Sequence, residues 1–447
     1  MNYKSLKDCL LDAISSTASR ISSLCSCPDR DFTRNRLLPA GTLMRFLISM
    51  GSLDLTDDLT DFFGIGAHIP SASALCQQRA KLDPEALRDV LIGFTSAAAP
   101  GPSASGYRFF AIDGSALSFK IDRRHPERIA DYIVDCGHSA KGFCSIHINA
   151  LFDLDDSLYR DAVLQPVRTK DEFGAFCQLV DRFDMPGPGN AIFIADRGYP
   201  SYNTMAHVIE AGHFFLFRVK DINSKGMLRA FGLSDTSFDT RRTLTIVRRS
   251  SKKLTASFPK GQCRFVGKDI AFDFADYGSD QSYSMDLRIV RFPLDDANSV
   301  YECLVTNLPE EDFPLSAMKE LYFRRWSIES SFRDLKYTIG LRNLHSLNPV
   351  LVQQEIYARL VMYNFITACS KLAEVKHRRK TAHVYKVDFS SAAKACKDYL
   401  RLASSFAEPV LLNTLSRFLV PVRPGRQYER LKTAHFRPPR HLTYRPS

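Results

Sequence analysis

The chain has 447 residues, of which 45% are hydrophobic and 24% charged, and its formal net charge is +11 with a pI near 9.1. These ordinary globular values exclude a wholly disordered chain, and the positive charge favours a polyanionic partner. The eleven cysteines include no CxxC pair, which argues against a zinc ribbon and favours reduced thiols. There is no run of about 18 apolar residues, and charges interrupt the first 25, so we expect a soluble cytoplasmic protein without a membrane span.

The N-terminal hundred residues have helical patterns. Apolar residues recur with helical periodicity at 38–50 and 53–63. Ser71 precedes a short segment at 72–82 that is rich in Gln, Arg and Lys. This segment could be a DNA-recognition helix, although an ordinary small helical bundle explains it at least as well. We expect a helical DNA-binding region at 1–100, ending in a linker at 97–106 that is rich in Ala, Pro, Ser and Gly.

The next segment alternates strand and helix patterns. Strand-like runs lie at 107–112, 144–152, 157–164, 191–195 and 214–219, and helical periods lie at 171–183 and 202–211. This order predicts an α/β fold, a mixed sheet flanked by helices, over 101–220. Asp113 follows the first run and Asp196 the fourth, and ligands of such sheets gather outside strand ends.

The remainder divides into three parts. Residues 221–300 contain polar turns, short strand patterns and basic pairs, which predict a β-rich insertion. Residues 301–372 resume the core with a strand at 301–306, a helix between Pro314 and Gly340, and an apolar helix at 356–372. Residues 373–447 form a C-terminal region with a helix at 388–403 and a basic tail in which Glu429 is the only acid after 421. We expect this tail to follow DNA phosphates, the alternative being a solubilising end.

The helix between Pro314 and Gly340 carries an aligned polar set. At about 100° per residue, its members fall within roughly 60° of one another beside an apolar stripe. They are Tyr322, Arg325, Glu329 and Lys336. Taken alone, this pattern fits equally well a surface helix with an Arg325–Glu329 ion pair at i,i+4 spacing.

Three carboxylates thus stand at informative places: Asp113, Asp196 and Glu329. Clustered carboxylates repel one another unless a cation neutralises them. Oxygen ligands without an organised His or Cys set favour Mg²⁺ or Mn²⁺, and two such ions about 4 Å apart can promote phosphodiester displacement. The neighbouring helix residues would then hold the nucleic-acid backbone; these are Tyr322, Arg325 and Lys336.

Other polar residues are interpreted as structural. The acidic run Asp153, Asp155 and Asp156 fits a hairpin turn, and Asp135 with His138 has no partner at a motif spacing. We interpret His138 and His147 as structural.

The motifs together resemble a known signature. Ile112-Asp113-Gly114, Asp196-Arg197-Gly198-Tyr199 and Tyr322-x2-Arg325-x3-Glu329-x6-Lys336 are similar to those of DDE transposases, in the bacterial insertion-sequence group with a β-strand insertion before the catalytic Glu. The resemblance covers roughly residues 30–370. It implies an RNase H-like catalytic core interrupted by that insertion.

The resemblance also implies an activity. Asp113, Asp196 and Glu329 would be the catalytic triad and the ligands of two Mg²⁺ ions, with Mn²⁺ able to substitute. Tyr322, Arg325 and Lys336 would contact the DNA backbone. The expected function is cut-and-paste transposition: a homodimer in a synaptic complex cleaves at terminal inverted repeats and joins the 3′-hydroxyl to target DNA, on the bacterial nucleoid. The alternatives are a domesticated or inactive transposase that only binds DNA, and a stand-alone RNase H-like nuclease.

Overall fold

The computed structural model describes residues 5–422, except 35–36, 52–53, 67, 99–105, 135–141, 185–189, 225, 252–256, 260, 295–299 and 377–383. Most of the expected linker, His138 and the basic tail from 423 onward therefore lie outside the described residues. No helix within the described ranges has the length and apolar character that a bilayer crossing requires.

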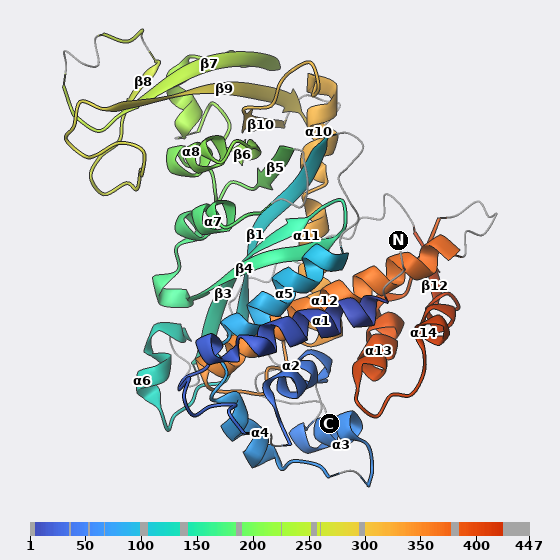
Figure 1. The fold of residues 1–447 in the computed structure, drawn as a ribbon. Helices are drawn as coiled ribbons and strands as arrows, with labels where there is room; N and C mark the ends of the chain where they lie inside the picture. The colour runs from blue at the N-terminus through green and yellow to red at the C-terminus, as the bar shows by residue number, and fades with distance from the viewer. Residues whose placement is uncertain are drawn as a thin grey trace.

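A ten-stranded mixed sheet forms the centre of the molecule, in the order β2-β3-β1-β5-β6-β10-β9-β7-β8 with β4 paired to β3 (Figure 1). Strand β1 is antiparallel to β3 and parallel to β5, and β5 is parallel to β6, which confirms the predicted RNase H-like mixed sheet. The strands are β1 (Tyr107–Phe119), β2 (Ile133–Val134), β3 (Phe143–Asp153), β4 (Leu158–Pro166), β5 (Asn190–Ala195), β6 (Phe214–Val219), β7 (Phe238–Val247), β8 (Cys263–Phe265), β9 (Ser282–Pro293) and β10 (Tyr301–Thr306). A separate pair joins β11 (Tyr385–Val387) and β12 (Leu419–Pro421).

Helices cover both faces of the sheet. One face packs against α7 (Glu172–Asp181) and α8 (Tyr202–Glu210). The other face packs against α5 (Glu85–Ala98), α11 (Trp326–Asp334) and α12 (Pro349–Lys376), the long orange helix of Figure 1. The other helices are α1 (Leu6–Ser19), α2 (Ala40–Ser49), α3 (Leu55–Phe63), α4 (Ala72–Arg79), α6 (Pro126–Ile129), α10 (Leu315–Phe323), α13 (Phe389–Leu400) and α14 (Glu408–Leu415).

The predicted β-rich insertion continues the central sheet. Strand β10 lies between β6 and β9 and is antiparallel to both, and β9 is antiparallel to β7. The basic pair Arg241-Arg242 lies on β7, away from the helical end of the molecule (Figure 1). The insertion is therefore hydrogen-bonded to the core through β10.

The expectation that the first strand ends at Ile112, just before Asp113, is wrong. Strand β1 continues to Phe119, because β3 pairs with it as far as Phe119 and Cys144. Leu117 and Phe119 are buried, so the alternation of apolar residues resumes after the Gly114-Ser115 step that resembles a turn in the sequence.

The short helix that could recognise DNA, α4, begins after Ser71 as expected, since the Ser71 side chain accepts a hydrogen bond from the Ala74 N–H. Its arginine, however, is directed into the protein. Arg79 is 1% exposed and its Nη2 lies 3.0 Å from Glu355 Oε1 of α12. The exposed polar side chains of α4 are Ser73 and Gln77, so Arg79 attaches this helix to the core and is not available to DNA.

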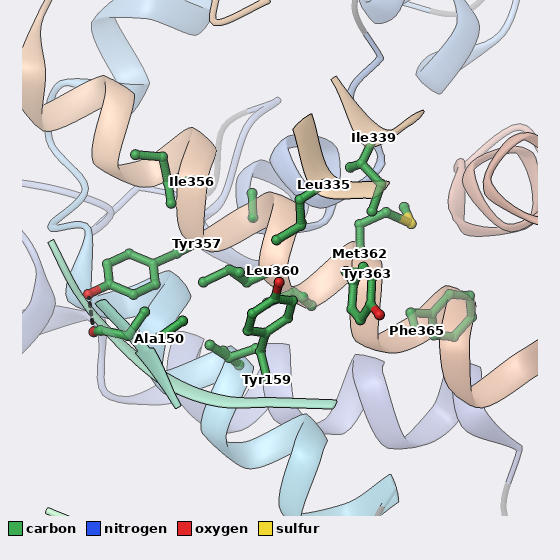
Figure 2. Packing of buried hydrophobic residues seen from close by; sticks show 14 of the residues in the cluster. Ala150, Tyr159, Leu335, Ile339, Ile356, Tyr357, Leu360, Met362, Tyr363 and Phe365 are labelled. Atoms are coloured by element: carbon green, nitrogen blue, oxygen red, sulfur yellow. Dashed lines mark hydrogen bonds between the residues drawn. The ribbon is translucent and has the colours of Figure 1, made fainter. Parts of the chain in front are cut away.

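The packing around α12 fixes the end of the helix that carries the polar set. Leu335 and Ile339 pack in the same core as Tyr363 of α12 (Figure 2). The Tyr159 ring of β4 lies 5.0 Å from the Tyr363 ring, and its hydroxyl lies 2.6 Å from Ser331 Oγ. These contacts hold α11 against the sheet.

Candidate active site

Two predicted carboxylates lie side by side on one face of the sheet. Ile112 and Ala195 form the last parallel pair of β1 and β5, so Asp113 and Asp196 follow on neighbouring strands. Phe109 and Ala111 on β1, and Ile192 and Ile194 on β5, pack into the core on the α11 side. Because side chains alternate along a strand, Asp113 and Asp196 point to that same side.

The third carboxylate, Glu329, comes from α11. The single helix predicted between Pro314 and Gly340 is divided into α10, α11 and a π-helical turn. Between α10 and α11 the chain tightens: the Arg325 N–H donates to the Tyr322 carbonyl and the Ile328 N–H to the Arg325 carbonyl. After α11 it widens into a π-helical turn (Leu335–Ile339), which ends at Gly340 with a φ of +97°, as the predicted C-cap requires. The 3₁₀ step and the π turn change the register that a uniform 100° rotation assumes.

Arg325 joins the three carboxylates. Its Nη1 lies 3.2 Å from Asp113 Oδ2, and its Nη2 lies 2.9 Å from Glu329 Oε1 and 3.9 Å from Asp196 Oδ2. The residue is 1% exposed, and its Nε has no hydrogen-bond partner among the described residues. One guanidinium therefore pairs with three acids that come from β1, from the end of β5 and from α11.

The two aspartates differ in acidity. Burial raises the pKa of Asp113 to about 6, although Arg325 and the Gly114 N–H oppose the rise. Burial also disfavours the Asp196 carboxylate, but the Arg197 N–H, Arg325 and Arg218 stabilise it and hold its pKa below the usual range. Asp113 is therefore the carboxyl with the stronger need for a nearby cation.

Tyr322 also belongs to this cluster, whereas Lys336 does not contact it. The Tyr322 hydroxyl donates to Asp196 Oδ1 at 3.1 Å, and burial raises the pKa of this phenol. Lys336 is half-buried in the π turn, and its ammonium forms no ion pair with any residue that the structure describes. Burial, together with the charge of Arg342, lowers the pKa of Lys336.

Two charged residues that the sequence analysis missed, Arg218 and Glu302, extend the cluster from Asp196 to the neighbouring strands β6 and β10. Arg218 on β6 lies with its Nη1 3.5 Å from Asp196 Oδ1 and its Nη2 3.3 Å from Glu302 Oε2 on β10. Glu302 is 3% exposed. Their signal in the sequence is a single charge within each of two apolar strand patterns, since buried charges are rare unless they are paired.

Gly114 has a steric role next to Asp113. A Cβ atom here would lie 2.6 Å from His147 Nε2 and 2.9 Å from the Tyr199 hydroxyl. That hydroxyl donates to Asn149 Oδ1 at 2.8 Å, and His147 Nε2 lies 3.0 Å from Glu172 Oε1 without hydrogen-bond geometry. The glycine of the Asp-Gly motif therefore lets β1 approach this polar layer.

The acidic run between β3 and β4 forms the predicted hairpin turn. Asp153 is fully buried, and its Oδ2 accepts hydrogen bonds from both Arg108 and Arg160. The Asp155 and Asp156 N–H groups donate to its Oδ1. These acids are used in the fold, as expected.

The three carboxylates suit a hard divalent cation, but the Arg325 guanidinium lies between them. Asp113, Asp196 and Glu329 offer only carboxylate oxygens, the ligands that Mg²⁺ and Mn²⁺ prefer. Within the described ranges, no three His, Cys, Asp or Glu side chains are grouped so as to hold a metal in their present positions. The carboxylates converge on one cation, and that cation is a guanidinium.

One comparison with known proteins identifies the family of the chain. A family model described as the transposase DDE domain matches residues 104–365. Among solved structures, the chain is similar to the piggyBac transposase synaptic complex with hairpin DNA, with 10% identity and a TM-score of 0.44 over 94% of this chain and 84% of that one. No curated protein matches the sequence. Because the family model spans more than half of its 447 residues, the chain belongs to the DDE transposases.

Proposed function

We propose that this DNA transposase moves a bacterial insertion sequence by cut-and-paste transposition. In this proposal, the protein cleaves DNA at the terminal inverted repeats and then joins the freed 3′-hydroxyl to target DNA. The observation that supports it most directly is the convergence of Asp113, Asp196 and Glu329 on one cationic group. Clustered carboxylates of this kind suit phosphodiester chemistry, because divalent ions, when bound, activate the attacking oxygen and stabilise the leaving one.

The residues have distinct roles in the proposal. Asp113, Asp196 and Glu329 would hold two Mg²⁺ ions, or Mn²⁺ in their place. Tyr322 and Arg218 orient Asp196, to which they are already bonded. Arg325 and Lys336, with Tyr322, would contact phosphates of the transposon end, where a guanidinium can pair with two phosphate oxygens. The helical N-terminal region and the basic C-terminal region would add contacts to DNA, and two copies would hold the two ends together.

The test is cleavage of DNA that carries the inverted repeats flanking the gene, by purified full-length protein with Mg²⁺. Asp113→Asn, Asp196→Asn and Glu329→Gln should each abolish cleavage while binding to the repeats persists. Asp280→Asn is the matched control, since Asp280 pairs with Arg249 on the exposed surface of the insertion.

Full cleavage by any one of the three site variants would overturn the assignment. Wild-type protein that binds the repeats but does not cleave them under any Mg²⁺ or Mn²⁺ condition would favour the alternative of an inactive, DNA-binding transposase.

A further inference from the structure

We infer that Arg325 takes the place of the metal in the DNA-free protein, so that a divalent ion enters the triad only when this side chain leaves it. The inference rests on the proposed function, since it presumes that the triad holds metal. It assigns Arg325 a role before DNA is bound, as a counter-ion that keeps the assembled carboxylates together.

The geometry of the carboxylates supports the inference. Arg325 reaches Asp113 and Glu329 at hydrogen-bond distance, 3.2 and 2.9 Å, and Asp196 at 3.9 Å. The guanidinium therefore contacts the same three acids that would hold an ion. Carboxylates bind Mg²⁺ through direct contact at about 2.1 Å, so the ion and the guanidinium compete for the same oxygens.

Charge and burial make joint occupancy unfavourable. The Arg325 side chain is 2% exposed, so little water screens its charge from an ion placed between Asp113 and Glu329. Repulsion between like charges a few ångströms apart grows as water is excluded. Arg218 already supplies a second cation at Asp196, which adds to the repulsion.

The surroundings of Arg325 also provide for its release. Its guanidinium carbon lies 5.3 Å from the centre of the Trp326 ring and 5.6 Å from that of Tyr322. Trp326 is 41% exposed, so one aromatic neighbour of the guanidinium reaches the surface. Cation–π contact keeps a guanidinium favourable beside such a ring after it loses its carboxylates. Once displaced, Arg325 can bind a DNA phosphate. The same side chain therefore pairs with the carboxylates before metal binds and with phosphate afterwards.

The experiment is a Mn²⁺ titration of the full-length protein without DNA, followed by electron paramagnetic resonance. Arg325→Met removes the competing charge and should bind Mn²⁺ at least about tenfold more tightly than wild type. Arg324→Met is the matched control, because the neighbouring Arg324 pairs with Asp155 outside the triad, and it should bind as wild type does. Arg325→Met combined with Glu329→Gln should lose the gained affinity, which places the ion at the triad.

Thermal unfolding gives a second measurement. Without metal, Arg325→Met should melt at a lower temperature than wild type, because three carboxylates then lack their counter-ion, and Mn²⁺ should restore much of the loss. Wild type should respond less to Mn²⁺. If Arg325→Met does not fold, Arg325→Gln replaces it, since its amide carries no charge but can still donate hydrogen bonds to a carboxylate. Tighter Mn²⁺ binding than wild type again supports the inference.

Equal or weaker Mn²⁺ binding by the Arg325 variant overturns the inference. If wild type nevertheless cleaves DNA with Mg²⁺, the proposed function stands and only the role of Arg325 falls. If the Arg325 variants bind no Mn²⁺ and wild type does not cleave, both are overturned.

Discussion

Arg218 bridges two acids, one on β10 and one at the end of β5: its Nη2 is 3.3 Å from Glu302 Oε2, and its Nη1 is 3.5 Å from Asp196 Oδ1. Glu302 is buried on β10 and faces the same side of the sheet as the candidate triad. Because β10 also pairs with β9, the insertion strand next to it in the sheet, this acid links the insertion to the candidate site.

Glu302→Gln should therefore impair cleavage without unfolding the protein. Burial raises the pKa of Glu302, so its charge is itself disfavoured, and the neutral amide should change the free energy of unfolding by no more than about 1 kcal/mol. Arg218 would then be drawn wholly to Asp196 and would compete with metal there. We expect about tenfold slower cleavage at low Mg²⁺, recovered in part at high Mg²⁺.

Urea unfolding and the Mg²⁺ dependence of the cleavage rate measure the two effects. Asp280→Asn is the control for loss of one acid at a surface ion pair, with an effect within about 0.5 kcal/mol. A Glu302→Gln protein with an unchanged Mg²⁺ dependence would show that Glu302 has no part in positioning Asp196.

Gly114→Ala should damage the site through sterics alone. The new Cβ would lie 2.6 Å from His147 Nε2 and 2.9 Å from the Tyr199 hydroxyl, so β1 or those side chains must move. Overpacking of this kind destabilises by about 1–3 kcal/mol. Because Asp113 is the adjacent residue, we expect cleavage to fall by about tenfold or more.

Gly267→Ala is the control, since nothing lies within 4 Å of a Cβ at that position. Chemical denaturation and cleavage assays of the two alanine variants make the comparison. Wild-type rates in Gly114→Ala would mean that β1 adapts without displacing Asp113.

Local patterns in the sequence were sufficient for most elements. The strand at 214–219 and the strand at 301–306 have the predicted bounds, and Ser71 caps α4 as its position indicates. Propensity and capping act over a few residues, so they can be read without tertiary information. The end of β1 could not be read this way, because only the pairing partner β3 extends the strand past Gly114.

The composition of the site was predicted better than its electrostatics. Strand alternation and motif spacing point to the three carboxylates. The burial of Arg325 and the 3₁₀ step beside it are properties of the folded chain that the helical period of the sequence does not indicate. Arg218 and Glu302 come together only through the register of β5, β6 and β10. Pairings between distant segments are a property of the fold, which local sequence does not encode.

Asp113→Asn should change how stability depends on pH. The pKa of Asp113 is about 6 in the folded protein, against about 3.9 for an unperturbed Asp. Between about pH 4 and 6, the Asp113 carboxyl is therefore protonated in the folded state and ionised in the unfolded state. The favourable contribution of this group is fully present below pH 4 and is lost as pH rises through 6. Relative to Asp113→Asn, wild type should lose roughly 1–3 kcal/mol of unfolding free energy between pH 4 and 7.

Urea unfolding of both proteins at several pH values, without divalent metal, tests this. Asp312→Asn is a control acid, because Asp312 is exposed and outside the triad. A constant difference between wild type and Asp113→Asn from pH 4 to 7 would contradict the raised pKa.

Glu355→Gln should loosen the N-terminal helices from the core. Glu355 is fully buried on α12, where Oε1 pairs with Arg79 and Oε2 accepts the His345 N–H. The amide leaves the buried Arg79 charge without its counter-ion, which costs about 3–5 kcal/mol. His345 and Arg79 outweigh the effect of burial and lower the pKa of Glu355 to about 2, so its contribution to stability is present above about pH 4.5 and is lost as pH falls toward 2.

Chemical denaturation at pH 7 and amide exchange of α4 measure the stability that Glu355→Gln loses. Glu85→Gln, at the half-exposed Glu85–Arg88 pair, should cost no more than about 1 kcal/mol. Equal losses in the two variants would mean that the Arg79–Glu355 pair does not attach α4 to α12.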